Sequence, residues 1–432
     1  MDSKKNGLAA RLAVLVAALG GVCTASGGIR VTFPAERQRL PAVRETYVIG
    51  AVDPGRTEWL YVNGVTTDVY RTGAFLAMVP VKSGTNTLTV FRGREKLVRT
   101  FVVASPPAAP ARRPEPILSD DDPRLGAPGA WQTVGTLFTN RVRSGIDDGD
   151  TLHHLPPDFL LRGAEVEGTA WVAVWLEGRR GYLPKAAVRP RPGVPVPSKG
   201  LIAPDPARGF PDHPPYGRRP ETVRICVDPG HGGSDAGARS PHGWCEKDVN
   251  LMQARAIRDA LEKAGFQVLM TRDDDSFPAL YDRPKMAYDA CVDAFISVHH
   301  NATPAHRNPR EVRHTTAYAS MSNGLALAQC IQRHIAPVLA PVPNAGAQMR
   351  SYAVCRNPAV PSCLLEVDFV NLPEGEAESW NPVRQRKVAT AVVLGILDWM
   401  APPDAPKPPA AAAFAIMSSS RASARHGSGE KP

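Results

Sequence analysis

The sequence predicts a multi-domain chain, in which two small all-β domains precede a C-terminal α/β domain with a largely parallel sheet and flanking helices. A length of 432 residues exceeds one ordinary domain. Short strand-like segments separated by turn signals fill much of the N-terminal half, whereas apolar strands alternate with helical stretches after about residue 221. The 43 prolines gather in a few stretches, which indicates linkers between these parts.

The first β region covers residues 29–105, where apolar or alternating runs are separated by turns such as Asn63-Gly64 and residues 84–86. Strands at this spacing predict a small β-sandwich. The "VNG" strand and the "PV-x-x-GTN" turn resemble the immunoglobulin-like modules of bacterial envelope proteins. A linker is expected at residues 106–129.

A second strand-rich block is expected at residues 130–189. The order "VRSG", then "WVAVWLEGRRGYLP" resembles bacterial SH3-like domains, small barrels that often bind cell-wall peptides. Wall binding and a spacer role both remain open. Residues 190–220 are rich in Pro and Gly and predict a second linker.

The α/β domain is expected at residues 221–401, followed by a disordered Pro/Ala/Ser tail at 402–432. Apolar runs predict strands, and apolar residues at helical spacing predict helices. The expected strands are 223–228, 267–271, 293–298 and 362–367, and the expected helices are 250–265, 279–291, 323–339 and 383–400.

The first 27 residues have the order of a secretory signal: basic Lys4, Lys5 and Arg11, an apolar run over 12–22, and then small residues. We therefore expect export to the periplasm or cell envelope, with no stable membrane insertion after signal removal. The net charge of +9 comes without a basic run or an aromatic-spaced stripe. This pattern is typical of a solvated basic surface. If the charge serves binding, an anionic envelope polymer fits it better than nucleic acid does.

Seven cysteines occur, of which Cys23 falls in the expected signal and six lie in the C-terminal half. An even number in an exported domain permits disulfides, but the sequence selects no pairing. Because no CxxC pair exists, a cysteine-based zinc site is not expected.

Three metal-ligand residue types follow predicted strands or begin a predicted helix. His231 lies just past the first strand of the α/β domain, Glu246 near the start of its first helix, and His299 past another strand. Ligand sites of α/β sheets gather at these strand ends. Two imidazoles and one carboxylate with an open fourth position form a standard catalytic set for one zinc ion.

Glu366 is a carboxylate at the end of an otherwise apolar strand, where burial is costly unless the group is paired or functional. In a hydrolytic site it would take a proton from water and pass one to the departing amine.

Residues 223 to about 400 resemble the zinc-dependent N-acetylmuramoyl-L-alanine amidases, the family that includes bacterial cell-separation enzymes. The matching motifs, in order, are "VDPGHGGSDAGA", "EKDVNL", "TRDDD", "FISVHHNA" and "CLLEVDFVN". The resemblance implies that His231, Glu246 and His299 bind zinc, that Glu366 is catalytic, and that the substrate is peptidoglycan. It also implies cleavage of the bond between N-acetylmuramic acid and L-alanine.

Two departures from the family pattern concern the substrate groove and the second histidine. His300 fills a slot that the family gives to a small residue, and Tyr288 replaces an Asn. Cell-separation enzymes often carry a helical insertion that covers the zinc. Here the strand at 317–320 runs almost directly into the helix at 323, which predicts an open metal site and basal activity of the isolated domain.

Two alternative functions stay open: a wall-binding scaffold with an inactive amidase domain, and a zinc peptidase cutting within the stem peptide. The presence of all four site residues favours the amidase. Any regulatory or targeting partner is unknown.

Overall fold

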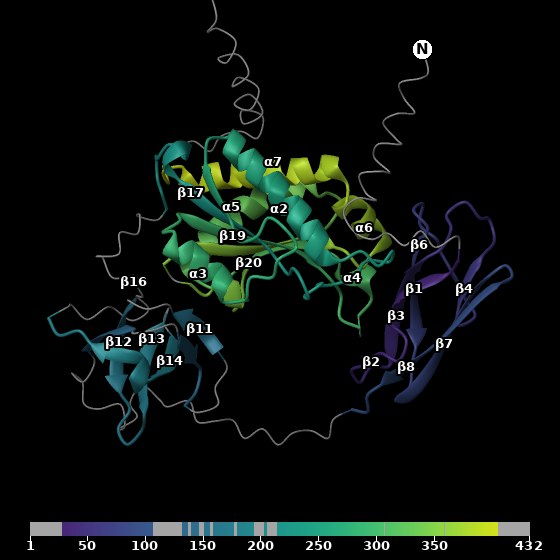
Figure 1. Ribbon diagram of the computed structural model, residues 1–432, viewed down its shortest axis with the longest axis horizontal. Helices are drawn as coiled ribbons and strands as arrows, with labels where there is room; N and C mark the ends of the chain where they lie inside the picture. The colour runs from purple at the N-terminus through teal and green to yellow at the C-terminus, as the bar shows by residue number, and fades with distance from the viewer. Residues whose placement is uncertain are drawn as a thin grey trace, which may run out of the picture.

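The computed structural model describes residues 28–106, 132–136, 140–146, 151–155, 159–176, 179–193, 203–204, 214–305, 307–357 and 359–404 (Figure 1). The expected signal at 1–27, most of both expected linkers and nearly all of the expected tail lie outside these ranges. Within them, no helix is long and apolar enough to cross a membrane.

The N-terminal region is a sandwich of two sheets. One sheet has the order β1-β3-β6 and the other β2-β8-β7-β4-β5. Their strands are β1 Arg30–Phe33, β2 Arg39–Leu40, β3 Glu45–Ala51, β4 Leu60–Val62, β5 Val65–Thr67, β6 Ala74–Pro80, β7 Gly84–Arg92 and β8 Glu95–Val103. Side chains from both sheets, such as Val48, Phe75 and Leu88, meet in a shared apolar core.

The middle β-domain forms one curled set of antiparallel strands with the order β11-β10-β14-β13-β12-β9-β15, and β16 pairs with β12. The strands are β9 Gln132–Thr136, β10 Asn140–Arg143, β11 Thr151–Leu155, β12 Phe159–Glu165, β13 Trp171–Leu176, β14 Arg179–Pro184, β15 Val188–Pro190 and β16 Ala203–Pro204. Val142, Leu161 and Val174 are among its fully buried side chains.

The C-terminal domain is built on a six-stranded sheet with the order β18-β17-β19-β22-β20-β21. All neighbouring pairs are parallel except β20 and β22, which are antiparallel. The strands are β17 Arg224–Pro229, β18 Gln267–Met270, β19 Ala294–Asn301, β20 Thr315–Ala319, β21 Asn344–Met349 and β22 Ser362–Phe369. The predicted fold class, two all-β regions and a largely parallel α/β domain, is confirmed.

Three long helices cover one face of this sheet and seal a large apolar core (Figure 1). They are α2 Glu246–Lys263, α5 Ser322–Val338 and α7 Pro382–Met400. On the other face, α3 (Asp282–Asp289) and the short turn at Ala353–Cys355 pack over a smaller core that includes Phe295 and Leu364. α2 begins at Glu246, earlier than the start at residue 250 that the spacing of apolar residues predicts. The first turn escaped this prediction because it is polar and partly faces the site.

The short helices α4 (Pro309–Val312) and α6 (Pro373–Ser379), and the edge strand β21, were not expected from the sequence. β21 reads Asn-Ala-Gly-Ala-Gln-Met and lacks the β-branched residues typical of strands. Within the described residues, none of the six cysteines after residue 220 forms one of the disulfides that their number permits.

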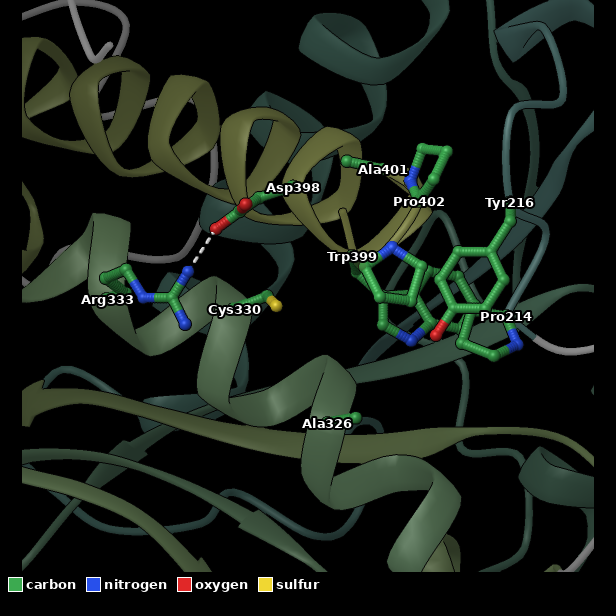
Figure 2. Close-up of a pocket in the computed structure, with 10 residues that line it drawn as sticks. Pro214, Tyr216, Ala326, Cys330, Arg333, Asp398, Trp399, Ala401 and Pro402 are labelled. Carbon is green, nitrogen blue, oxygen red and sulfur yellow. Dashed lines mark hydrogen bonds and ion pairs between the residues drawn. The ribbon is translucent and has the colours of Figure 1, made fainter. Parts of the chain in front are cut away.

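A cavity of about 210 Å³ lies on the helical side of the domain, between α5, α7 and the segment around Tyr216 (Figure 2). The Arg333–Asp398 ion pair and Trp399 line it. It contains none of the predicted site residues, so it is separate from the candidate active site.

Candidate active site

The loop after β17 delivers His231 to the carboxyl edge of the sheet. His231 adopts a φ of 61°, a left-handed conformation that non-glycine residues rarely take and that often marks functional sites. Two arginines hold this loop by its carbonyl groups. Arg272 donates to Pro229 and Gly230, and Arg283 donates to Pro229 and His231.

Arg283 is itself fixed by a buried ion pair with Asp228, at 2.9 Å. Asp228 also accepts hydrogen bonds from Thr271 and Ser297. Arg272, in the "TRDDD" motif, and Arg283 therefore fix the backbone that carries His231.

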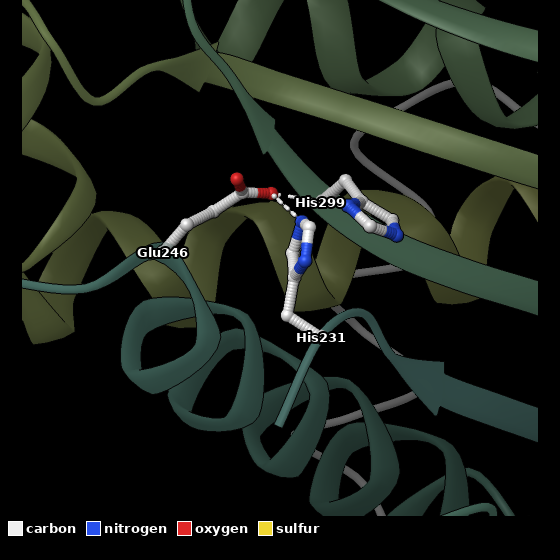
Figure 3. Close-up of side chains that lie close together, drawn as sticks. All are labelled: His231, Glu246 and His299. Carbon is white, nitrogen blue, oxygen red and sulfur yellow. Dashed lines mark hydrogen bonds and ion pairs between the residues drawn. The ribbon is translucent and has the colours of Figure 1, made fainter. Parts of the chain in front are cut away.

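His231, Glu246 and His299 come together as the sequence predicts, with their ligand atoms all within 4.8 Å of one another (Figure 3). Glu246 Oε1 lies 3.2 Å from His231 Nε2 and 3.0 Å from His299 Nδ1. The two imidazole rings meet edge to face, with centroids 4.9 Å apart. Gly230 makes room for this approach, because a Cβ atom there would lie 2.1 Å from His299 Nε2.

Polar neighbours orient His231 and Glu246. Asp235 Oδ2 lies 2.8 Å from His231 Nδ1, which directs the other ring nitrogen toward Glu246. Ala238 N donates to Glu246 Oε2, and the Asn250 amide donates to Glu246 Oε1. Sequence reasoning missed the roles of Asp235 and Asn250, although both lie in motifs that it quoted.

The charges of these groups are strongly coupled. Burial by itself would raise the pKa of Glu246, but hydrogen bonds from His231 and His299 lower that pKa well below its ordinary value. Burial opposes protonation of His231, yet its contacts with Glu246 and Asp235 prevail and raise its pKa to about 9. Without metal, these shifts favour an ionised Glu246 beside a protonated His231 at neutral pH.

Glu366 lies on the neighbouring strand, directly opposite His299 in the register of β19 and β22. It is in the middle of β22 rather than at its end, and its Oε2 is inaccessible with no hydrogen-bond partner among the described residues. Burial, reinforced by the charge of Glu246, raises the pKa of Glu366 well above its ordinary value. Glu366 thus lies beside His299 and close to Glu246, although it is not at a strand end.

His300 points away from this group and into the domain. Its Nδ1 lies 2.9 Å from Asn250 Oδ1, and burial lowers its pKa to about 4, so the ring is neutral. Only Ser320 and Met321 separate β20 from α5, so no helix is inserted there to cover the site. The side chains of His231 and His299 remain 23% and 18% exposed.

Comparisons with known proteins find similarity in the C-terminal domain. Residues 225–398 match the family profile described as N-acetylmuramoyl-L-alanine amidase. A probable cell wall amidase, LytH of Staphylococcus aureus, is 33% identical over 174 residues, which are 40% of this chain and 56% of that protein. The chain thus spans little more than half the length of this curated relative.

Solved structures with similarity include the amidase AmiC2 of Nostoc punctiforme, at 31% identity over 41% of this chain and 97% of that one, with a TM-score of 0.39. The catalytic domain of the amidase CwlV from Bacillus (Paenibacillus) polymyxa is 27% identical over 41% of this chain and 98% of that one, also with a TM-score of 0.39. The family match thus covers the part of the C-terminal domain that contains His231, Glu246, His299 and Glu366.

Proposed function

We propose that this protein is a zinc-dependent amidase that hydrolyses the bond between N-acetylmuramic acid and L-alanine in peptidoglycan. His231, Glu246 and His299 bind the one zinc ion, and Glu366 carries the proton. The observation that supports this most directly is the convergence of the three ligand atoms within 4.8 Å in a domain that matches the amidase family. Beside them lies Glu366, whose Oε2 has no hydrogen-bond partner among the described residues.

The donor set fits zinc. Two imidazole nitrogens and one carboxylate oxygen are a common catalytic combination, and the Asp235 carboxylate behind His231 is a typical outer partner of a zinc-binding histidine. When bound, zinc supplies Lewis-acid chemistry that stabilises negative charge on oxygen.

Glu366 handles the proton. As a carboxylate it accepts a proton from the water whose oxygen forms the new bond to the lactyl carbonyl carbon. It then gives that proton to the alanine nitrogen as the carbon–nitrogen bond breaks, which leaves a carboxylic acid on the sugar and a free amine on the peptide. A raised pKa suits the second half of this task, because a carboxyl group that holds its proton more tightly can carry it to the leaving nitrogen.

The same proposal places the protein in the cell envelope, after export directed by residues 1–27, with peptidoglycan and not nucleic acid as its partner. The N-terminal sandwich is proposed to be immunoglobulin-like and the middle β-domain SH3-like. A targeting role of the middle β-domain predicts that its deletion lowers activity on intact wall while sparing soluble muropeptides.

The test is incubation of the purified, zinc-loaded full-length protein with peptidoglycan, followed by mass spectrometry of the products. Stem peptides with a free L-alanine amine support the amidase. Fragments cut within the stem identify a peptidase, and binding without release identifies a scaffold. Glu262→Gln, an exposed change on α2, is the matched control for Glu366→Gln.

A further inference from the structure

One face of the sandwich is apolar where an isolated domain would be polar. β3 reads Glu-Thr-Tyr-Val-Ile-Gly-Ala and β6 reads Ala-Phe-Leu-Ala-Met-Val-Pro, and nearly every residue of both strands is buried. Uninterrupted apolar runs are typical of strands covered on both faces. By contrast, β7 alternates between buried and accessible residues, as expected for a strand with one face in water.

The C-terminal domain covers this second face. Side chains of β3 and β6 pack with residues at the end of β22 and just after it in one apolar cluster. Its fully buried members are Tyr47, Ile49, Leu76, Phe369 and Leu372, with exposures of 6% or less. Figure 1 shows the sandwich beside α4 and α6, at the end of the domain where these segments lie.

Polar contacts extend the interface to two loops. The Tyr47 hydroxyl donates a buried hydrogen bond of 2.9 Å to the carbonyl of Thr303. Thr32 donates to the carbonyl of Pro241 at 2.7 Å, and Arg30 donates to the carbonyl of His242. Ala305 also packs against the core of the sandwich.

These contacts fall beside each part of the site. Thr303 lies four residues after His299, His242 four residues before Glu246, and Phe369 three residues after Glu366. The sandwich therefore contacts three segments of the chain that lie next to His299, Glu246 and Glu366, which are two of the proposed metal ligands and the proposed proton carrier.

We propose that the sandwich is a fixed part of the catalytic unit and that Tyr47 is a positioning residue for the loop that follows His299. Docking holds the three segments in the geometry that metal binding requires. A catalytic domain produced alone from near Glu221 would have Phe369 and Leu372 exposed and would lack the contacts with the sandwich. We therefore do not expect this domain to be structurally independent, although the linker before it suggests that it is.

The test compares two substitutions in the full-length protein. Leu76→Glu places a charge in the interface, and Val98→Glu places the same charge on the opposite sheet, where Val98 is 55% exposed. Zinc affinity is measured by competition with a chromogenic chelator, and mobility by hydrogen exchange of peptides that contain residues 302–305. Because neither readout needs turnover, the result is independent of whether the protein is the amidase proposed above.

We expect Leu76→Glu to weaken zinc binding by about tenfold or more and to speed exchange at 302–305, while Val98→Glu matches the parent protein. Equal zinc affinity and equal exchange in both variants would overturn the proposal. If Leu76→Glu does not fold, the Tyr47→Phe variant tests the proposal instead, because it removes only the hydroxyl group that donates to the carbonyl of Thr303. Faster exchange at 302–305 with a several-fold loss of zinc affinity supports a positioning role, and parent-like values of both refute it.

Discussion

The two carboxylates of the site lie close together but in opposite environments. Glu246 accepts hydrogen bonds from a backbone amide, from Asn250 and from both histidines, and its pKa lies well below the ordinary value. Glu366 Oε2 has no hydrogen-bond partner among the residues that the structure describes, and the pKa of Glu366 lies well above its ordinary value. Pairs of groups whose pKa values are pushed apart in this way commonly divide acid and base work between them.

The difference separates a metal side from a proton side. The loop after β17, α2 and β19 contribute the three proposed metal ligands and their hydrogen-bonding partners, whereas β22 contributes a carboxyl group whose Oε2 has no hydrogen-bond partner among the described residues. Substitutions on the metal side should reduce zinc binding. Substitutions on the proton side should reduce the rate of hydrolysis while zinc remains bound.

The largest effect is expected from His231→Ala. Loss of one ligand from a three-ligand site should reduce zinc binding below stoichiometric levels and activity to background. Metal analysis after dialysis and release of stem peptides measure the two quantities. Chelation of zinc from the parent protein should reproduce the loss, and zinc should restore the parent but not the variant. Full zinc content with full activity in His231→Ala would refute this assignment.

Next in size is Glu366→Gln, which keeps the shape of the side chain but cannot carry a proton. We expect zinc binding to persist and hydrolysis to fall by about a hundredfold or more. The same metal analysis and product assay apply, with Glu262→Gln as the control. Zinc loss in this variant would instead make Glu366 a fourth ligand, and the division between the two sides would fail.

Part of this site and of the fold could be predicted from the sequence. The sequence could predict that His231, Glu246 and His299 lie close together, because their motifs follow strands or begin a helix, and the strand ends of one parallel sheet meet at one edge. Glu366 was placed beside them by its motif, although it lies within β22 and not at its end. The packing of the sandwich against the C-terminal domain was not predicted. A Pro-rich linker suggests that the two domains are separate, and it carries no information about which of their surfaces pack together. β21 was missed because tertiary pairing with β20, rather than its own composition, makes it a strand.

On the metal side, zinc affinity should depend on pH through His231, because zinc and the proton compete for one nitrogen. The pKa of His231 is raised from 6.5 to about 9 in the metal-free protein, so the contribution of its proton to stability is complete below pH 6.5 and is lost as pH rises through 9. Zinc affinity should therefore rise by about tenfold per pH unit from 6.5 and level off above 9.

Chelator competition across this range measures that dependence, and thermal unfolding of the metal-free protein measures the opposite trend in stability. Asp235→Asn removes one of the groups that raise the pKa and should move both transitions to lower pH. Zinc affinity that does not vary between pH 6.5 and 9 would show that His231 is not protonated before metal binds.

The smallest effect is expected from His300→Ala, which tests how the metal side is supported from behind. A neutral His300 with its proton on Nδ1 donates to Asn250 Oδ1, and this leaves the Asn250 amide nitrogen to donate to Glu246 Oε1 at 3.2 Å. Without the imidazole, the Asn250 amide can rotate, and Glu246 loses a fixed donor. We expect His300→Ala to bind zinc stoichiometrically at saturation but with an affinity about tenfold weaker.

The double variant His300→Ala/Asn250→Ala should bind zinc little more weakly than Asn250→Ala alone, because both changes break one chain of hydrogen bonds. His334→Ala, on α5 beside Asp398, is the control. Additive losses in the double variant would show that His300 acts by filling space rather than by orienting Asn250.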